Sequence, residues 1–153
     1  MKLHSDLREF IELLNAHGVE FVVVGGHAVG FHGHPRYTGD IDFVVRPTPE
    51  NAARIVQVLR TFGFPDAGKL EESLTDPATI VQLGRPPNRI DLLASISGVT
   101  FDALWTRSVP ATLDGVPVRF PDLDSLLANK RASGRAKDLA DVEELERPDR
   151  SEE

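Results

Sequence analysis

The aspartate pair in Asp40-Ile41-Asp42 constrains this chain more than any other feature. The pair follows an apolar run, Phe21 to Val24, that ends in the glycines Gly25 and Gly26. Because side chains alternate between the two faces of a strand, Asp40 and Asp42 are predicted to project to one side while Ile41 points into the core. Two like charges held so close are costly unless a cation lies between them or one of them takes a proton. The pattern therefore predicts a strand that carries an acidic site.

A metal and a phosphate both fit this site. Oxygen ligands favour a hard divalent cation, so we expect Mg²⁺ or Mn²⁺ at Asp40 and Asp42. Gly25 and Gly26 permit a tight turn and a close approach of the backbone to a phosphate, which the amides of a following helix would then meet. The alternatives are a strand with a solvent-exposed acidic face and an Asp40 that only caps a turn. The glycine pair upstream favours the metal–phosphate interpretation.

Asp91 is a candidate third carboxylate, because it interrupts the otherwise apolar segment Ile90 to Leu93. A lone buried carboxylate needs a partner, so an ion pair with Arg89 or Arg85 is the other interpretation.

The apolar periodicity predicts an α/β (α+β) fold with one mixed sheet flanked by helices. A single domain is expected over residues 1–146, followed by a polar, disordered tail over 147–153. The expected helices cover Leu7–Leu14 with Ser5 as the cap, Ala28–Phe31, a segment that begins at Thr48-Pro49 and ends at Gly63, and two C-terminal helices that meet near Gly134, the first capped by Asp122. The expected strands cover Glu20–Val24, Ile41–Val45, Thr79–Leu83, Arg89–Leu93 and Val116–Phe120, the last as an edge strand.

Composition limits the classes of protein to which the chain belongs. The chain has 153 residues, of which 41% are hydrophobic and 27% charged, and its formal net charge is -7. No apolar run reaches membrane-spanning length and the N-terminus lacks a signal-like apolar segment, so a cytoplasmic protein without a membrane partner is expected. The absence of cysteine excludes disulfides and thiol catalysis. The acidic balance argues against a broad basic surface for nucleic acid, although Lys130, Arg131, Arg135 and Lys137 form a local basic cluster.

The motifs together resemble a known family. A Gly-Gly or Gly-Ser pair, about a dozen residues, and then Asp-apolar-Asp is similar to the signature of the DNA polymerase β-like nucleotidyltransferase superfamily. The fuller string, Gly25-Gly26-x-Ala28 with His32-Gly33-x-Pro35-Arg36-x-Thr38-x-Asp40-Ile41-Asp42, resembles its small prokaryotic branch. That branch includes minimal nucleotidyltransferases and the toxin nucleotidyltransferases of abortive-infection systems. The similarity extends from about Leu7 to Leu145, but Gly26 stands where serine is more usual.

The resemblance implies a Mg²⁺-dependent transferase that moves a nucleoside monophosphate from an NTP such as ATP to an acceptor hydroxyl and releases pyrophosphate. Asp40, Asp42 and Asp91 would bind the metal, and Asp91 could also serve as the general base. Gly25, Gly26, Arg36 and Thr38 would contact the nucleotide. The later motifs match Lys130, implied to meet phosphates, and Asp138, implied to assist the chemistry. A solvated lysine and an aspartate that favours a helix N-terminus are the alternatives for these two.

The sequence leaves several acceptors and two other functions open. The acceptor could be RNA or tRNA, a protein or a small molecule, and a toxin would have a cognate antitoxin. A non-catalytic module that keeps the fold would bind Mg·NTP without turnover. A metal-dependent nuclease would release nucleotides without consuming NTP.

Overall fold

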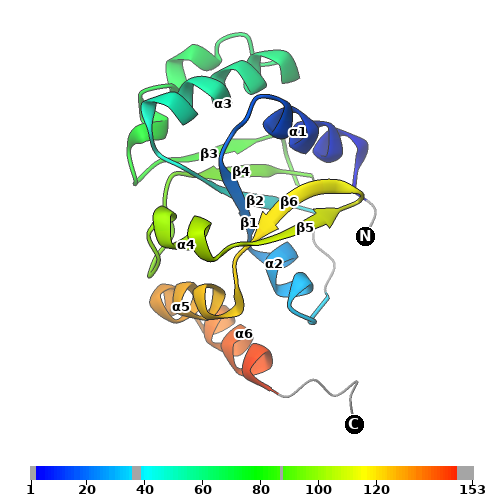
Figure 1. Ribbon diagram of the computed structural model, residues 1–153, viewed down its shortest axis with the longest axis vertical. Coiled ribbons are helices and arrows are strands. Elements are labelled where there is room, and N and C mark those ends of the chain that lie inside the picture. The colour runs from blue at the N-terminus through cyan, green and yellow to red at the C-terminus, as the bar shows by residue number, and fades with distance from the viewer. Residues whose placement is uncertain (1–2, 36–38, 87, 148–153) are drawn as a thin grey trace.

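The computed structural model describes residues 3–35, 39–86 and 88–147, and it is built around a four-stranded sheet with helices on both sides (Figure 1). The helices are α1 (Ser5–Ala16), α2 (Gly26–Phe31), α3 (Pro49–Phe62), α4 (Phe101–Arg107), α5 (Leu123–Ser133) and α6 (Ala136–Glu146), with short 3₁₀ turns η1 (Ala67–Leu70) and η2 (Ser73–Thr75). The strands are β1 (Phe21–Val24), β2 (Ile41–Val45), β3 (Ile80–Leu83), β4 (Ile90–Leu93), β5 (Val109–Leu113) and β6 (Val116–Phe120).

The main sheet has the strand order β1-β2-β4-β3 and is mixed. Strand β2 pairs antiparallel with β1 and parallel with β4, and β3 returns antiparallel to β4. In the central parallel pair Asp42 lies opposite Asp91, and in the antiparallel pair Val24 lies opposite Asp42. The predicted α/β class with a mixed sheet is confirmed.

One face of this sheet carries most of the apolar core. Helices α1 and α3 lie together over it (Figure 1), and Ile41, Phe43 and Val45 of β2 are fully buried there. The ring of Phe10 in α1 lies 5.7 Å from that of Phe43. Alternation along β2 therefore sends Ile41 into the core, as predicted, and leaves Asp42 on the opposite face.

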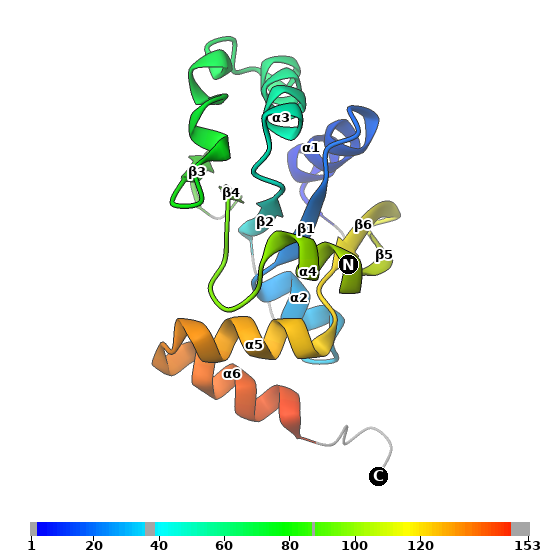
Figure 2. The same cartoon turned by 60° about the vertical axis from the view of Figure 1, so that its left-hand side comes forward.

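The second face is covered in part by α4. Val22 of β1, Val44 of β2 and Leu104 of α4 form a separate apolar cluster. Asp42 and Asp91 share this face because they alternate with the core residues Phe43 and Leu92. Helices α5 and α6 form a layer below the sheet (Figure 2), and residues of both helices line a pocket together with the two aspartates.

Local signals at the helix ends explain where α3 and α5 begin and end. The Thr48 hydroxyl accepts a hydrogen bond from the Asn51 amide (3.3 Å), Pro49 occupies the first turn, and Gly63 with φ 119° ends α3. These caps confirm the sequence prediction, as do Asp122 and Gly134 at the ends of α5. The predicted Ser5 cap is wrong, because His4 caps α1 by accepting the Asp6 amide at its Nδ1 (3.2 Å).

A second, two-stranded sheet was not expected. Strands β5 and β6 form a hairpin through Asp114, whose φ of 50° suits the turn. Sequence reasoning missed β5 because Pro110 counts against a strand, but in a two-stranded ladder one side of each strand needs no partner. The hairpin contacts α1, where Asn15 Nδ2 donates to the Pro117 carbonyl (2.8 Å).

Two further predictions concern the whole chain. The division into a domain over residues 1–146 and a tail stays a prediction, since residues 148–153 lie outside the described part. In the described residues, none of the helices combines the length and apolar character that crossing a bilayer requires.

Candidate functional site

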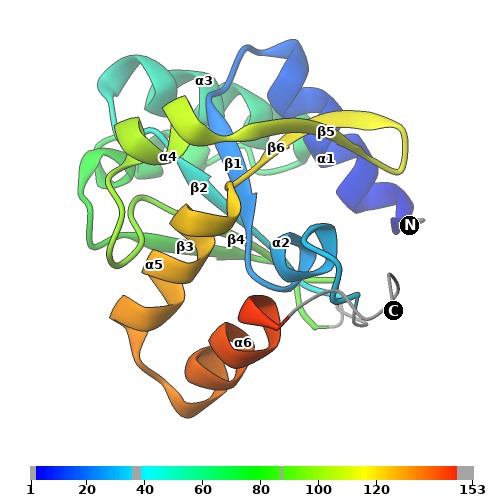
Figure 3. The same ribbon diagram turned by 60° about the horizontal axis from the view of Figure 1, so that its bottom comes forward.

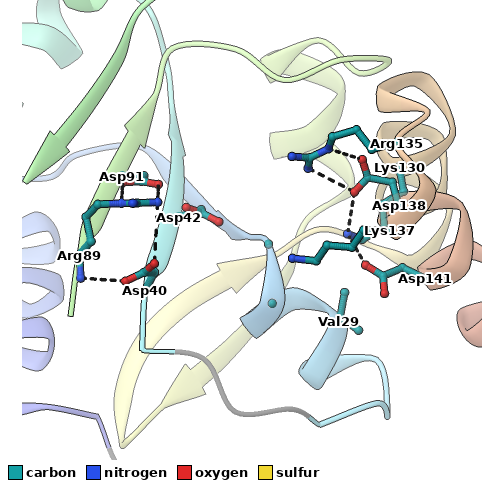
Figure 4. Close-up of a pocket in the computed structure, with 12 residues that line it drawn as sticks. Val29, Asp40, Asp42, Arg89, Asp91, Lys130, Arg135, Lys137, Asp138 and Asp141 are labelled. Carbon is teal, nitrogen blue, oxygen red and sulfur yellow. Dashed lines mark hydrogen bonds and ion pairs between the residues drawn. The ribbon is translucent and has the colours of Figure 1, made fainter. Parts of the chain in front are cut away.

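A polar pocket of about 370 Å³ lies between the acidic face of the sheet and the α5–α6 layer. Seen from below, α5 and α6 lie beside α2, which follows directly from β1 (Figure 3). One wall comes from Gly25 and Gly26 and from three carboxylates with Arg89 (Figure 4); Asp42 and Asp91 lie on β2 and β4, and Asp40 directly precedes β2. The facing wall consists of Lys130, Arg135, Lys137, Asp138 and Asp141 from the two C-terminal helices. Residues from 39 (Asp91 to Lys130) to 116 (Gly25 to Asp141) positions apart in the sequence therefore line one cavity.

Asp42 and Asp91 form the centre of the acidic wall. They are register partners on β2 and β4, so their side chains stand next to each other on one face. Partial burial, a hydrogen bond with Asp91 and the Asp91 charge together raise the pKa of Asp42 to about 6. Burial is the largest of these causes, the neighbouring Asp91 comes second, and the charge of Arg89 offsets part of the effect.

Arg89 forms ion pairs with two of the three carboxylates, Asp91 and Asp40. Its Nε and Nη2 donate to the two oxygens of Asp91 at 2.8 and 3.1 Å, and its backbone amide donates to Asp40 Oδ1 at 3.0 Å. Nη2 also lies 3.7 Å from Asp40 Oδ2. The hydrogen bonds to Asp91 raise the pKa of Arg89. The ion pair between Asp91 and Arg89 that the sequence left open is therefore present, in the same place as the predicted third carboxylate.

The glycine turn fits closely against the acidic strand. Gly25 has φ 71° and ψ -147°, a region open essentially to glycine alone, and it precedes the first residue of α2. A Cβ atom built on Gly25 would collide with the carboxylate of Asp42. The turn and the acid thus form one surface of the pocket, which explains why the chain needs glycine at position 25.

The facing wall is a network of ion pairs. Lys130 Nζ lies 2.9 Å from Asp141 Oδ2 and 3.7 Å from Asp138 Oδ1. Arg135 donates to both oxygens of Asp138, at 2.7 and 3.3 Å. The hydrogen bond from Arg135, together with the charges of Arg135 and Lys130, lowers the pKa of Asp138 even though its side chain is only 2% exposed. The predicted site residues Lys130 and Asp138 therefore contact each other and face the acids.

A hard divalent cation suits this donor set. In the part of the chain that the structure describes, no three acidic or imidazole side chains already converge as a ready metal cluster. Two of the three pocket carboxylates, Asp91 and Asp40, are paired with Arg89 instead. Three carboxylates with only oxygen donors, and a repulsion between Asp42 and Asp91 that persists beside Arg89, fit Mg²⁺ or Mn²⁺ nonetheless.

The comparisons with known proteins assign a family. A family model described as "nucleotidyltransferase of unknown function (DUF6036)" matches residues 2–147. The chain belongs to this nucleotidyltransferase family. The match agrees with the resemblance to the DNA polymerase β-like superfamily that the sequence motifs carry. No curated protein matches the chain.

The site residues predicted from the sequence agree in part with the residues that line the pocket. Gly25, Gly26, Asp40, Asp42, Asp91, Lys130 and Asp138 were predicted and all line the pocket. Arg36 and Thr38 lie outside the described residues. Arg135, Lys137 and Asp141 were not predicted as site residues, although the basic cluster and the spacing of Asp138 and Asp141 on one helix were visible in the sequence.

Proposed function

We propose that this member of the nucleotidyltransferase family transfers a nucleoside monophosphate from an NTP to an acceptor hydroxyl and releases pyrophosphate. The observation that carries the proposal is the pairing of Asp42 with Asp91 on adjacent strands, facing a cationic wall across one cavity. Adjacent carboxylates suit a divalent ion, and cations opposite them suit the phosphates that such an ion holds.

In this proposal Asp42 and Asp91 hold Mg²⁺ or Mn²⁺, with Asp40 as a further ligand. The bound ion supplies charge stabilisation at the phosphates and a lowered pKa at the attacking hydroxyl. Its positive charge would return the pKa of Asp42 from about 6 towards the ordinary range. Binding requires Arg89 to release Asp91, so the guanidinium and the metal are alternatives at this carboxylate.

The transfer step needs one proton acceptor. The acceptor oxygen forms a bond to the α-phosphorus, and the bond from that phosphorus to the oxygen bridging the α- and β-phosphates breaks. The electron pair leaves with pyrophosphate. The hydroxyl proton passes to Asp91, which the parallel register places next to Asp42. Gly25 and Gly26 hold the backbone close to the phosphates, and the cationic wall of α5 and α6 offsets their charge, while Asp138 holds Lys130 within that wall.

The acceptor is proposed by class. RNA or tRNA, a protein and a small molecule all offer a hydroxyl. The net charge of -7 disfavours a large RNA surface, but Lys130, Arg135 and Lys137 of the basic cluster line the pocket. A steep loss of binding with salt would point to RNA. A toxin with a cognate antitoxin would arrest growth on expression, and Asp42→Asn would relieve the arrest.

The test is pyrophosphate release from each of the four NTPs, with Mg²⁺ or Mn²⁺, with and without total cellular RNA. Asp42→Asn should abolish release, because it removes an anionic metal ligand. Asp124→Asn, an exposed acid on α5 outside the pocket, is the matched control and should keep it. Release that Asp42→Asn leaves intact would contradict the proposal.

A non-catalytic nucleotide-binding module is the second candidate. The specific observation in its favour is Arg89, which occupies Asp91 and Asp40 and would compete with a metal. Binding of Mg·NTP by the wild type without any release of pyrophosphate, across all acceptors tested, would support the module.

A further inference from the structure

The four cations that line the pocket differ in how their charge is compensated. Arg89 is bound by Asp91, and Arg135 is bound by Asp138. Lys130 is 90% buried at its side chain and lies between Asp138 and Asp141. Lys137 is the exception: within the described part of the chain no carboxylate lies within ion-pair distance of its amine. Figure 4 shows its side chain extending from α6 into the cavity, away from the carboxylates of its own helix.

The position of Lys137 is unfavourable for the helix that carries it. It lies in the first turn of α6, where the helix dipole is positive and where acidic residues stabilise. The preceding N-cap residue, Arg135, is also cationic and makes no capping hydrogen bond through its side chain. The Lys137 side chain is exposed and lines the pocket, so its amine is available to a ligand bound there.

The electrostatic field across the cavity also reaches this end of α6. The hydrogen bond from Arg135 to Asp138 is the main cause that raises the Arg135 pKa, and the charge of Asp42 on the opposite wall adds to it. A phosphate chain that bridges from the acidic strands to α6 would meet Lys137 before it met Lys130, because Lys130 is buried behind its two carboxylates.

We infer that Lys137 is the side chain that binds the triphosphate of the nucleotide, while Lys130 holds α5 and α6 together through Asp138 and Asp141. The inference rests on the proposed function and names the phosphate-binding residue within it. The sequence resemblance implied this role for Lys130 instead. A flexible ammonium suits this task, since it offers a point charge with three donors to a chain of phosphate oxygens.

The experiment measures dissociation constants by titration calorimetry in Mg²⁺, with ATP, CTP, GTP, UTP and inorganic tripolyphosphate as probes. The variants are Lys137→Gln, Lys137→Arg and, as the matched control, Lys69→Gln. Lys69 lies on η1, lines a different pocket and is exposed, so its change removes the same charge elsewhere.

Lys137→Gln should weaken binding of the preferred NTP and of tripolyphosphate by about tenfold or more, the range for a lost hydrogen bond to a charged group. Lys137→Arg should retain most of the affinity, and Lys69→Gln should match the wild type. The melting temperature of Lys137→Gln should stay level or rise, because a cation leaves the positive end of α6. A residue with a merely structural role would lower affinity and melting temperature together.

Two results would overturn the inference, and they differ in what else they affect. If the wild type binds an NTP and Lys137→Gln binds it equally well, the inference fails and the proposed function stands. If the wild type binds neither any NTP nor tripolyphosphate, the inference and the proposed function fail together.

Discussion

Gly25 packs directly against Asp42, so closely that a side chain at position 25 would occupy the space of the Asp42 carboxylate. The contact joins the end of β1 to the neighbouring strand β2, where Val24 and Asp42 are register partners. The positive φ of Gly25 turns the chain away from the sheet and into α2. Turn and acid are therefore positioned by one another.

Gly25→Ala should abolish activity and destabilise the protein. The backbone region costs a non-glycine residue about 1–3 kcal/mol, and the added methyl group would in addition displace Asp42. Urea unfolding and pyrophosphate release measure the two effects. Gly18→Ala is the matched control, because Gly18 has φ 67° but nothing within 4 Å of an added Cβ. It should lose stability alone, and a Gly25→Ala variant with wild-type activity would contradict this account.

Asp42→Asn should stabilise the metal-free protein at neutral pH. The folded-state pKa of about 6 lies above the ordinary 3.8, so the stability linked to Asp42 is complete below pH 3.8 and is lost as pH rises through 6. At pH 7 the ionised carboxyl costs about 1–2 kcal/mol after discounting for its partial exposure. Urea unfolding in EDTA at pH 4, 5.5, 7 and 8 should show a gain for Asp42→Asn that grows with pH. A variant less stable than wild type at pH 7 would contradict the prediction.

Asp138→Asn should show the opposite dependence. Its pKa is lowered by the hydrogen bond from Arg135, so its contribution to stability is present above the ordinary value of 3.8 and lost as pH falls. Losing a buried partner of two cations should cost about 3 kcal/mol at pH 7. The same unfolding series should show this loss shrinking towards pH 4, and a loss independent of pH would argue against the ion-pair network as its cause.

Arg89→Gln should tighten the binding of Mn²⁺. Arg89 holds Asp91 and Asp40 by ion pairs that the metal must displace, and such exposed pairs are weak, so the expected gain in affinity is only a few-fold. Electron paramagnetic resonance of free Mn²⁺ measures the constant. Arg85→Gln, in the same β3–β4 connection but exposed, is the control. Weaker binding by Arg89→Gln would show that Arg89 positions the acids instead of competing for them.

Asn51→Ala should destabilise the fold without touching the pocket. The side-chain oxygen of Asn51 accepts a hydrogen bond from the Glu20 N–H at 2.8 Å, and its Nδ2 donates to the Glu20 and Arg46 carbonyls at 3.1 and 3.0 Å. These hydrogen bonds tie α3 to the start of β1 and the end of β2. The side chain is 2% exposed, so its removal leaves buried backbone groups without hydrogen-bond partners. The free energy of unfolding should fall by about 2–4 kcal/mol. Gln57→Ala, exposed on the same helix, should change the free energy of unfolding by less than about 0.5 kcal/mol. Equal losses for both variants would contradict the role of Asn51.

Local chemistry explains which parts of the fold the sequence predicts. Thr48, Gly63 and Asp122 act through hydrogen bonds or dihedral angles within a few residues, and their roles follow from residue type and spacing. The alternation that places Asp42 opposite the core is equally local. Strand β5 was missed because Pro110 is a poor strand residue in general, and only the hairpin partner makes it acceptable.

The parts of the site that depend on long-range contacts could not be predicted from the sequence. The pairing of Asp42 with Asp91 depends on the register of two strands nearly fifty residues apart, which no local pattern specifies. The closeness of α6 to the acidic strands depends on how the C-terminal helices dock. Sequence reasoning therefore named Lys130 from its motif, while the geometry that distinguishes it from Lys137 exists only in the folded chain.

The most direct test of the central claim follows the position of bond cleavage. Wild-type protein is incubated with Mn²⁺, cellular RNA and protein, and an NTP carrying radiolabel at either the α- or the γ-phosphate. A nucleotidyltransferase centred on Asp42 and Asp91 should leave the α-label on an acceptor and release the γ-label as pyrophosphate, and Asp42→Asn should do neither. Transfer of the γ-label to an acceptor, or α-label transfer undiminished in Asp42→Asn, would contradict the account.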